Sequence, residues 1–151
     1  MNGAPQDFGS LFAGLVRVEL VPRYRMNIEA PAAERISFVV LAPTVATMAE
    51  WRHAQGLAEV AAAQRLATIG EPTSDEHAAA VASVVAANAD RSRVFTDQVI
   101  EVRHGAIRRA VSDANRDAFR EQSFADRPEL LVELELSWIR LGVVGAASGK
   151  G

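Results

Sequence analysis

The chain has 151 residues, of which 49% are hydrophobic, and its 16 basic and 19 acidic side chains give a formal net charge of −3. This length can bury the core of a single domain. The acidic excess argues against a nucleic-acid partner, because phosphate binding usually needs a basic face. The chain has no cysteine, which excludes disulfides, thiolate metal sites and cysteine nucleophiles.

The N-terminus has neither the basic start nor the apolar core of a signal peptide. The longest apolar run, near Phe38–Pro43, is far shorter than the roughly 18 residues that span a bilayer. We therefore expect a soluble, cytoplasmic protein with no membrane partner.

Residues 1–10 show no periodicity and are predicted to form a flexible arm. From Leu15 to Glu29 the apolar side chains keep one parity, which predicts a strand or strand pair with one buried face. Pro22 cannot donate to a sheet, so it implies an edge strand or a break into two strands. The side chains predicted to be buried are Val16, Val18, Leu20, Tyr24, Met26 and Ile28.

Residues 35–41 predict a second strand that pairs back on the first and is buried on both faces. Thr44 can cap a helix, and the apolar spacing predicts that this helix runs to a stop at Gly70. The capping-box sequence Thr73–Glu76 then predicts a second helix over 74–89.

After a break at 88–92, two neighbouring apolar stripes predict a buried helix over about 95–114. The polar stretch 113–127 is predicted to be a loop or short helix anchored by Phe119 and Phe124. The five arginines from Arg103 to Arg120 are balanced by acids between Asp97 and Glu121, which favours a solvated helical face over a binding surface.

The segment 130–141 fits two periods, since its leucines repeat at helical spacing while residues 132–138 also alternate as a strand would. We predict a helix, because Asp126 and Pro128 form a specific helix start. The small-residue tail 142–151 is predicted to be flexible.

Together these patterns predict an α+β fold, with a small N-terminal antiparallel β hairpin or sheet (about 15–41) packed on an alanine-rich helical body (about 44–141). A single domain is expected over 11–141, between the flexible arm and the flexible tail.

The side chains that carry catalysis or bind metals do not cluster in the sequence. His53, His77 and His104 fall in separate predicted helices, and none has the second ligand at i+3 or i+4 that helical metal sites use. Asp113 and Asp117 are expected beside arginines in solvent, and Glu133 and Glu135 are expected on the wet face of their segment. We therefore expect no catalytic, metal-binding or cofactor-binding residues, and no enzyme.

The two tryptophans lie on apolar stripes, where core packing is the default role and an interface anchor is the alternative. The alanine-rich helices offer few other bulky anchors, so we expect other proteins as partners, including a homo-oligomer. The predicted partner-binding residues are Trp51, Leu134, Trp138 and Leu141.

The order of segments resembles the small tail assembly chaperones of long-tailed bacteriophages. A strand leads into a proline-started helix at 36–44, a stretch at 99–107 precedes a polar Asp-rich turn at 112–119, and a Pro-Glu-Leu helix start follows at 128–130. The resemblance implies a non-enzymatic protein that keeps a tape-measure chain soluble while phage structural proteins assemble in an infected bacterium. It also implies that 99–105 is less helical than the apolar stripes predict.

Two alternatives stay open. The chain can be a small α+β ligand-binding protein with a pocket between sheet and helices, for which Tyr24, Arg25 and His53 are candidate lining residues. It can also be an accessory subunit of a larger enzyme.

Overall fold

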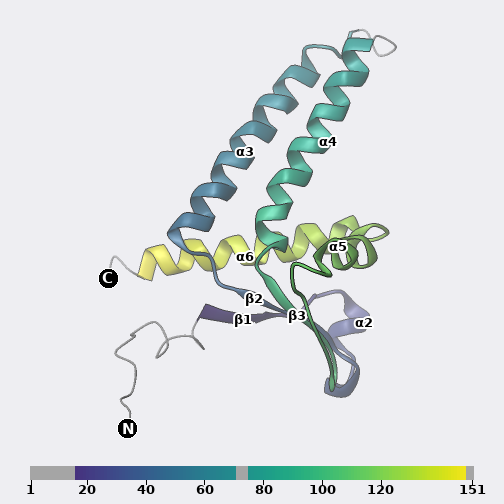
Figure 1. The fold of residues 1–151 in the computed structure, drawn as a ribbon, viewed down its shortest axis with the longest axis vertical. Coiled ribbons are helices and arrows are strands. Elements are labelled where there is room, and N and C mark those ends of the chain that lie inside the picture. The colour runs from purple at the N-terminus through teal and green to yellow at the C-terminus, as the bar shows by residue number, and fades with distance from the viewer. Residues whose placement is uncertain (1–15, 71–74, 149–151) are drawn as a thin grey trace. The chain divides into compact units, whose positions relative to one another are not determined.

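The computed structural model describes residues 16–70 and 75–148, which divide into two compact units (Figure 1). We name them the sheet unit (16–42 and 98–125) and the helical unit (43–97 and 126–148). The predicted arm at 1–10 lies outside the described residues. The single domain expected over 11–141 stays a prediction, because two compact units can belong to one cooperative fold or to two.

The sheet unit contains a four-stranded antiparallel sheet in the order β1-β2-β3-β4. Its strands are β1 (Arg17–Leu20), β2 (Ile36–Leu41), β3 (Val99–His104) and β4 (Ile107–Ala110). The predicted pairing of the first two strands is confirmed, with Leu20 opposite Phe38. Phe38, Val39 and Val40 are buried in succession, so β2 is covered on both faces as predicted. The mixed α and β class is therefore confirmed.

The prediction of a strand over the whole of 15–29 is wrong after Leu20. Residues 25–28 form a short helix, α2 (Arg25–Ile28), and a 3-10 turn, η2 (Ala32–Glu34), precedes β2. Met26 and Ile28 are 84% and 51% exposed, whereas Asn27 is buried. The Asn27 side chain explains this, because it donates to the Pro22 and Ile36 carbonyl oxygens and accepts from the Ile36 N–H, at 2.8–3.0 Å. The buried amide thus closes a compact loop where a strand was expected.

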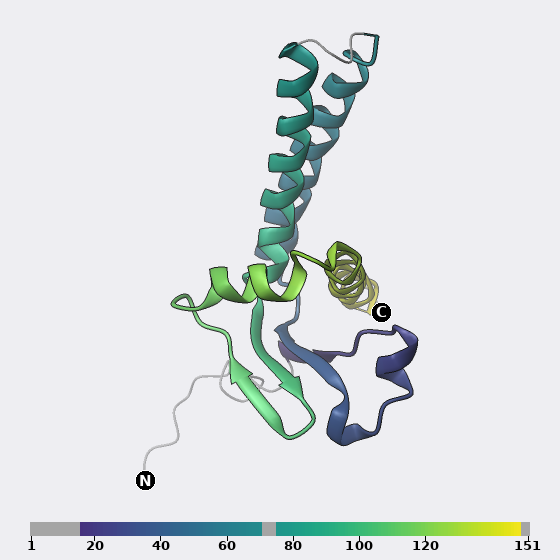
Figure 2. The same ribbon diagram turned by 90° about the vertical axis from the view of Figure 1, so that its right-hand side faces the viewer.

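The predicted helix over 95–114 is also wrong, because β3 and β4 form a hairpin there (Figure 2). Val102 of β3 lies opposite Phe38 of β2. Its side chain therefore packs on one face of the sheet and not in an interface between helices. Gly105 opens the two-residue turn with φ of +62°, a conformation that glycine adopts without strain. Arg103 and Arg108 therefore lie on strands, and the interpretation of their region as a solvated helical face is wrong.

One face of the sheet is covered by α5 (Arg116–Phe124), the short helix that the sequence left open as loop or helix. Its predicted anchors Phe119 and Phe124 are buried against Phe38, with ring centroids 6.3 and 6.1 Å from that ring and 5.5 Å from each other. Aromatic pairs at such distances favour tilted and offset geometries. This triad is the core of the sheet unit.

The helical unit is built from α3 (Val45–Leu66), α4 (Asp75–Thr96) and α6 (Pro128–Ser148). Thr44 caps α3 as predicted, since its hydroxyl accepts from the Thr47 N–H (3.1 Å) and the Thr47 hydroxyl accepts from the Thr44 N–H (2.8 Å). The helical assignment of 130–141 is confirmed, and α6 continues to Ser148 through most of the predicted tail. The capping-box residue Thr73 lies outside the described residues.

α3 and α4 lie side by side as an antiparallel hairpin in both views (Figures 1 and 2). Each has 22 residues, a length of about 33 Å at 1.5 Å per residue. Ala58 and Ala61 are the buried residues in the outer half of α3. The predicted break at 88–92 does not occur, because α4 continues to Thr96.

Candidate functional site

The helices of the helical unit meet at a buried carboxylate, Glu135 of α6. Its Oε2 accepts hydrogen bonds from the indole N–H of Trp51 on α3 and from Nε of Arg91 on α4, both at 2.9 Å. Its Oε1 accepts from the Ser92 hydroxyl at 2.7 Å. The Glu135 side chain is 5% exposed, and a charge so buried is tolerated only when it is paired and hydrogen-bonded.

Arg91 extends this network along the hairpin. Its Nη1 donates to the amide oxygens of Asn88 (2.8 Å) and Gln55 (3.1 Å). The bonds of Trp51, Gln55, Arg91 and Ser92 each join two different helices, and the bond of Asn88 holds Arg91 within α4. The network therefore specifies how the helices align. We call the six residues the Glu135 cluster: Trp51, Gln55, Asn88, Arg91, Ser92 and Glu135.

Sequence reasoning missed this cluster because Glu133 and Glu135 were both interpreted as a wet face. The signal was the spacing, since Glu135 lies three residues before Trp138 on the apolar side of α6. In the same way, Asn88 and Arg91 continue the helical period of α4 as polar members of a buried stripe.

The predicted partner-binding residues all lie in the helical unit, and they divide by exposure. Trp51 and Leu141 are half-buried, whereas Leu134 and Trp138 are 1% and 0% exposed. The Trp138 ring packs on Phe95, with centroids 5.7 Å apart. Leu134 and Trp138 therefore pack in the core of the helical unit, and we do not propose either of them as a partner contact.

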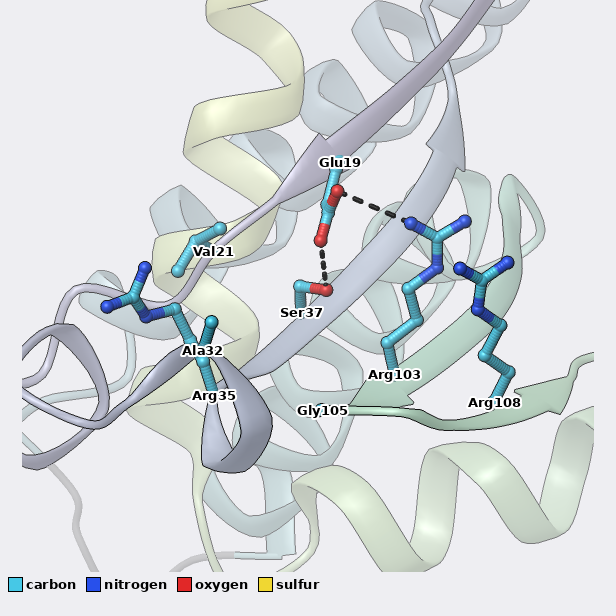
Figure 3. A pocket seen from close by; sticks show the side chains of 8 residues that line it. All are labelled: Glu19, Val21, Ala32, Arg35, Ser37, Arg103, Gly105 and Arg108. Atoms are coloured by element: carbon cyan, nitrogen blue, oxygen red, sulfur yellow. Dashed lines mark hydrogen bonds and ion pairs between the residues drawn. The ribbon is translucent and has the colours of Figure 1, made fainter.

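The second candidate site is an open hollow of about 340 Å³ on the face of the sheet opposite α5 (Figure 3). Glu19 of β1 reaches between Ser37 and Arg103, accepting from the Ser37 hydroxyl (2.5 Å) and from Arg103 Nη1 (3.4 Å). Arg108 extends beside Arg103, because the two residues are paired across β3 and β4.

Arg35 lines the same hollow but turns toward Val21, away from the other two arginines (Figure 3). Its Nη2 donates to the carbonyl oxygens of Ala30 (2.8 Å) and Ile28 (3.3 Å), so this guanidinium closes a loop. Its Nε is buried without a hydrogen-bond partner in the described part of the chain. Its arginines suit an acidic ligand group, but Glu19 already pairs with Arg103 and so weakens any such binding.

Arg103 also determines the electrostatics of its own strand. Its Nε donates to Glu101, and this hydrogen bond holds the pKa of Glu101 below its usual value, against an opposing contribution from burial. Coulomb attraction from Arg103, Arg108 and Arg17 lowers the pKa further. The same hydrogen bond raises the pKa of Arg103. The pair therefore stays ionised at neutral pH.

The residues expected to line a ligand pocket are divided between the two units. Tyr24 and Arg25 lie in the sheet unit and His53 in the helical unit, and all three side chains are exposed. His104 lies at the end of β3, not in a helix as predicted. Within residues 16–70 and 75–148, no group of three or more His, Asp or Glu side chains is arranged to hold a metal ion.

The most exposed of the large apolar side chains described in the helical unit lie on the hairpin. On α3, Val45 is 91% exposed, Leu57 and Val60 are each 55% exposed, and Leu66 is 66% exposed. Val60 lies on the side of the helix away from the buried Met48, Ala58 and Ala61, a side that we call the outer face of α3. Val45 and Leu57 lie beside this face, and Leu66 lies in line with Met48, five helical turns away. On α4, Val85 is 65% exposed. These side chains could contact another protein without any change in the packing of the hairpin.

Searches of protein-family profiles, characterised proteins and solved structures found no match to this chain. No helix in the described residues is long and apolar enough to cross a membrane.

Proposed function

We propose that this chain is a non-enzymatic protein-binding or assembly protein, and that its specific form is a tail assembly chaperone of a long-tailed bacteriophage, acting in the cytoplasm of the infected cell. The observation that carries the proposal is the aliphatic surface of the α3–α4 hairpin. Single exposed apolar residues are ordinary on protein surfaces, whereas rows of them indicate a binding surface.

The exposed apolar side chains of α4 follow the helical period and so form a row. On α4, Val85 continues a stripe of exposed alanines, Ala78, Ala82 and Ala89, at spacings of four, three and four. A client segment with an amphipathic helix could lie along such a stripe, as helix-in-groove partners do. The hairpin interface itself is thin, because alanine buries little area, and a further layer of protein would stabilise it.

Two points of segment order add support for the chaperone form. The helix after β2 follows Pro43 and the capping Thr44, and the closing helix α6 begins at Pro128. In addition, 99–104 is a strand, in line with the lower helicity that the resemblance implied.

The gene neighbourhood gives the first test. Tail-tube and tape-measure genes beside this one support the chaperone form, and metabolic genes overturn it. The biochemical test is to express the tape-measure protein of the same genome with and without this chain, and to measure how much of it remains in the supernatant.

We expect the wild-type chain to raise the soluble yield and V85E to lose that effect, because the charge interrupts the α4 stripe. The matched control is S83E, which adds the same charge to another exposed position of α4. A yield that does not depend on the chain contradicts the proposal, and equal losses in V85E and S83E contradict the assignment to the stripe.

A further inference from the structure

The outer face of α3 carries a seven-residue repeat. Small or apolar residues and one histidine recur from 46 to 67 at spacings that alternate between three and four, the pattern by which two helices pack along a seam. Gly56 is half-buried and the others are exposed, and the buried Met48, Ala58 and Ala61 lie off this seam. The seam is Ala46, Ala49, His53, Gly56, Val60, Ala63 and Ala67.

The residues along one flank of the seam are complementary in charge and polarity to the same residues taken in reverse order. Every seventh residue beside the seam gives the series Val45, Arg52, Glu59 and Leu66, which is apolar, basic, acidic and apolar. All four side chains are exposed, and Glu59 accepts a hydrogen bond of 3.2 Å from Gln55 of its own helix. An antiparallel second copy would therefore place Arg52 against Glu59, and Val45 against Leu66. A twofold axis forms each of these contacts twice.

The same alignment matches large seam residues with small ones. In an antiparallel pair the seam positions that face each other have one constant sum, here 109, and the flanking positions that face each other have a sum two higher, here 111. The alignment that joins Arg52 to Glu59 therefore places His53 over Gly56 and Val60 over Ala49. A Cβ built on Gly56 would meet nothing within 4 Å, so the space above this glycine is open. Glycine within a helix is less favourable than alanine, and a partner histidine packed there accounts for its presence.

Other alignments lose this agreement. A shift by one heptad opposes Glu59 with its own copy in one direction, and Arg52 with its own copy in the other, so both repel. A parallel pair brings Arg52 beside Leu57, and Glu59 beside Gln64, with no opposite charges. Charge therefore selects one orientation and one register.

We propose that the outer face of α3 binds a second copy of this chain as an antiparallel helix pair, with Arg52 of each copy against Glu59 of the other. This inference names the partner of one face of the hairpin and rests on the proposed protein-binding function. It uses α3 alone, whereas the client stripe lies on α4, so the two can fail separately.

The test is sedimentation equilibrium of the purified full chain at low ionic strength, over a wide range of concentration. The wild type is expected to dimerise reversibly. R52E and E59R each replace both attractive pairs by like-charge pairs, and each is expected to weaken the dimer by about tenfold or more. The double variant R52E/E59R swaps the charges and is expected to restore the dimer, and so is an equimolar mixture of the two single variants.

The control is R65E, which makes the same charge change on α3 away from the seam and is expected to leave the dimer unchanged. A wild type that stays monomeric at every concentration overturns the proposal, even if the chain binds a client. A dimer that R52E, E59R and R65E weaken equally, or that the mixture does not restore, also overturns it.

Orientation has its own test, because the chain has no cysteine. A mixture of A49C and V60C chains is expected to form a disulfide-linked dimer under mild oxidation, since these positions face each other across the antiparallel seam. A49C alone is expected to cross-link poorly. Efficient cross-linking of A49C alone would place like positions together, which is a parallel pair, and would overturn the proposal.

Discussion

Gly105 is the position at which one missing methyl group decides a turn. Its φ of +62° strains any other residue, and a Cβ there would lie 1.7 Å from the Ala33 carbonyl oxygen. We expect G105A to lower the free energy of unfolding by at least about 2 kcal/mol, because the left-handed conformation alone costs alanine about 1–2 kcal/mol. A lower urea midpoint measures this loss.

Gly56 provides the matched control for that substitution. A Cβ at Gly56 meets no atom within 4 Å, so G56A is expected to stabilise α3 by about 1 kcal/mol in the monomeric chain. A G105A protein as stable as the wild type would show that the β3–β4 turn is not formed as described.

Glu101 is the residue whose protonation should report on the sheet. Its carboxylate is favoured by the Arg103 hydrogen bond, so the pKa is lowered from the usual 4.5. A lowered carboxyl pKa adds stability above the pKa of the unfolded chain, and this contribution is lost as pH falls through the folded pKa. We expect the carboxyl carbon of Glu101 to titrate below 4.5 by NMR, and R103Q to move the midpoint up toward that value. R65Q should leave it in place, and a midpoint that R103Q does not move would contradict the assignment.

At the scale of elements, the Glu135 cluster joins three helices through one carboxylate. E135Q keeps the shape of the side chain but leaves Arg91 without a counter-charge in a half-buried setting. We expect it to lower the free energy of unfolding by about 3 kcal/mol, in the range seen when one member of a buried pair is removed. Thermal or urea unfolding measures the loss.

E50Q is the control for this variant, because it neutralises an exposed glutamate on α3 and is expected to change stability by less than about 0.5 kcal/mol. The double variant E135L/R91L removes both charges, so it is expected to lose less than E135L and R91L added together. Additive losses would mean that the two side chains do not interact.

Elements with local signals were predictable from the sequence, and those set by distant partners were not. Thr44 and Pro128 mark helix starts through their own backbone chemistry, and both helices were found. Val99 and Val102 fit a helix stripe and a strand equally well, and the choice is made by pairing with β2, which lies far away in sequence. Asn27 was missed for the same reason, since its partner Ile36 is nine residues away.

The candidate sites follow the same division. The apolar stripe of α4 that includes Val85 could be found from helical spacing, although sequence reasoning chose bulky Trp138 and Leu134, which are buried. Spacing shows that a helix has an apolar side, but not which of two apolar sides its own chain will cover. The Glu135 cluster needed contacts between helices whose alignment the sequence does not state.

At the scale of the whole molecule, the chain passes from one unit to the other three times, after Ala42, after Asp97 and after Ala125. Neither unit is therefore a continuous segment, and its parts must be synthesised separately in time before they pack. The sheet joins strands from before and after the α3–α4 hairpin, since β2 precedes that hairpin in the sequence and β3 follows it.

The Leu41 N–H donates to the Gln98 carbonyl oxygen at 2.9 Å, so the chain leaves and re-enters the sheet unit at nearly one point. The segment between these residues, which contains the α3–α4 hairpin, thus starts and ends where two neighbouring strands meet. Its length can change by insertion or deletion of whole heptads, while the strands on either side keep their ladder. The length of the α3–α4 hairpin can therefore change during evolution while the sheet stays the same.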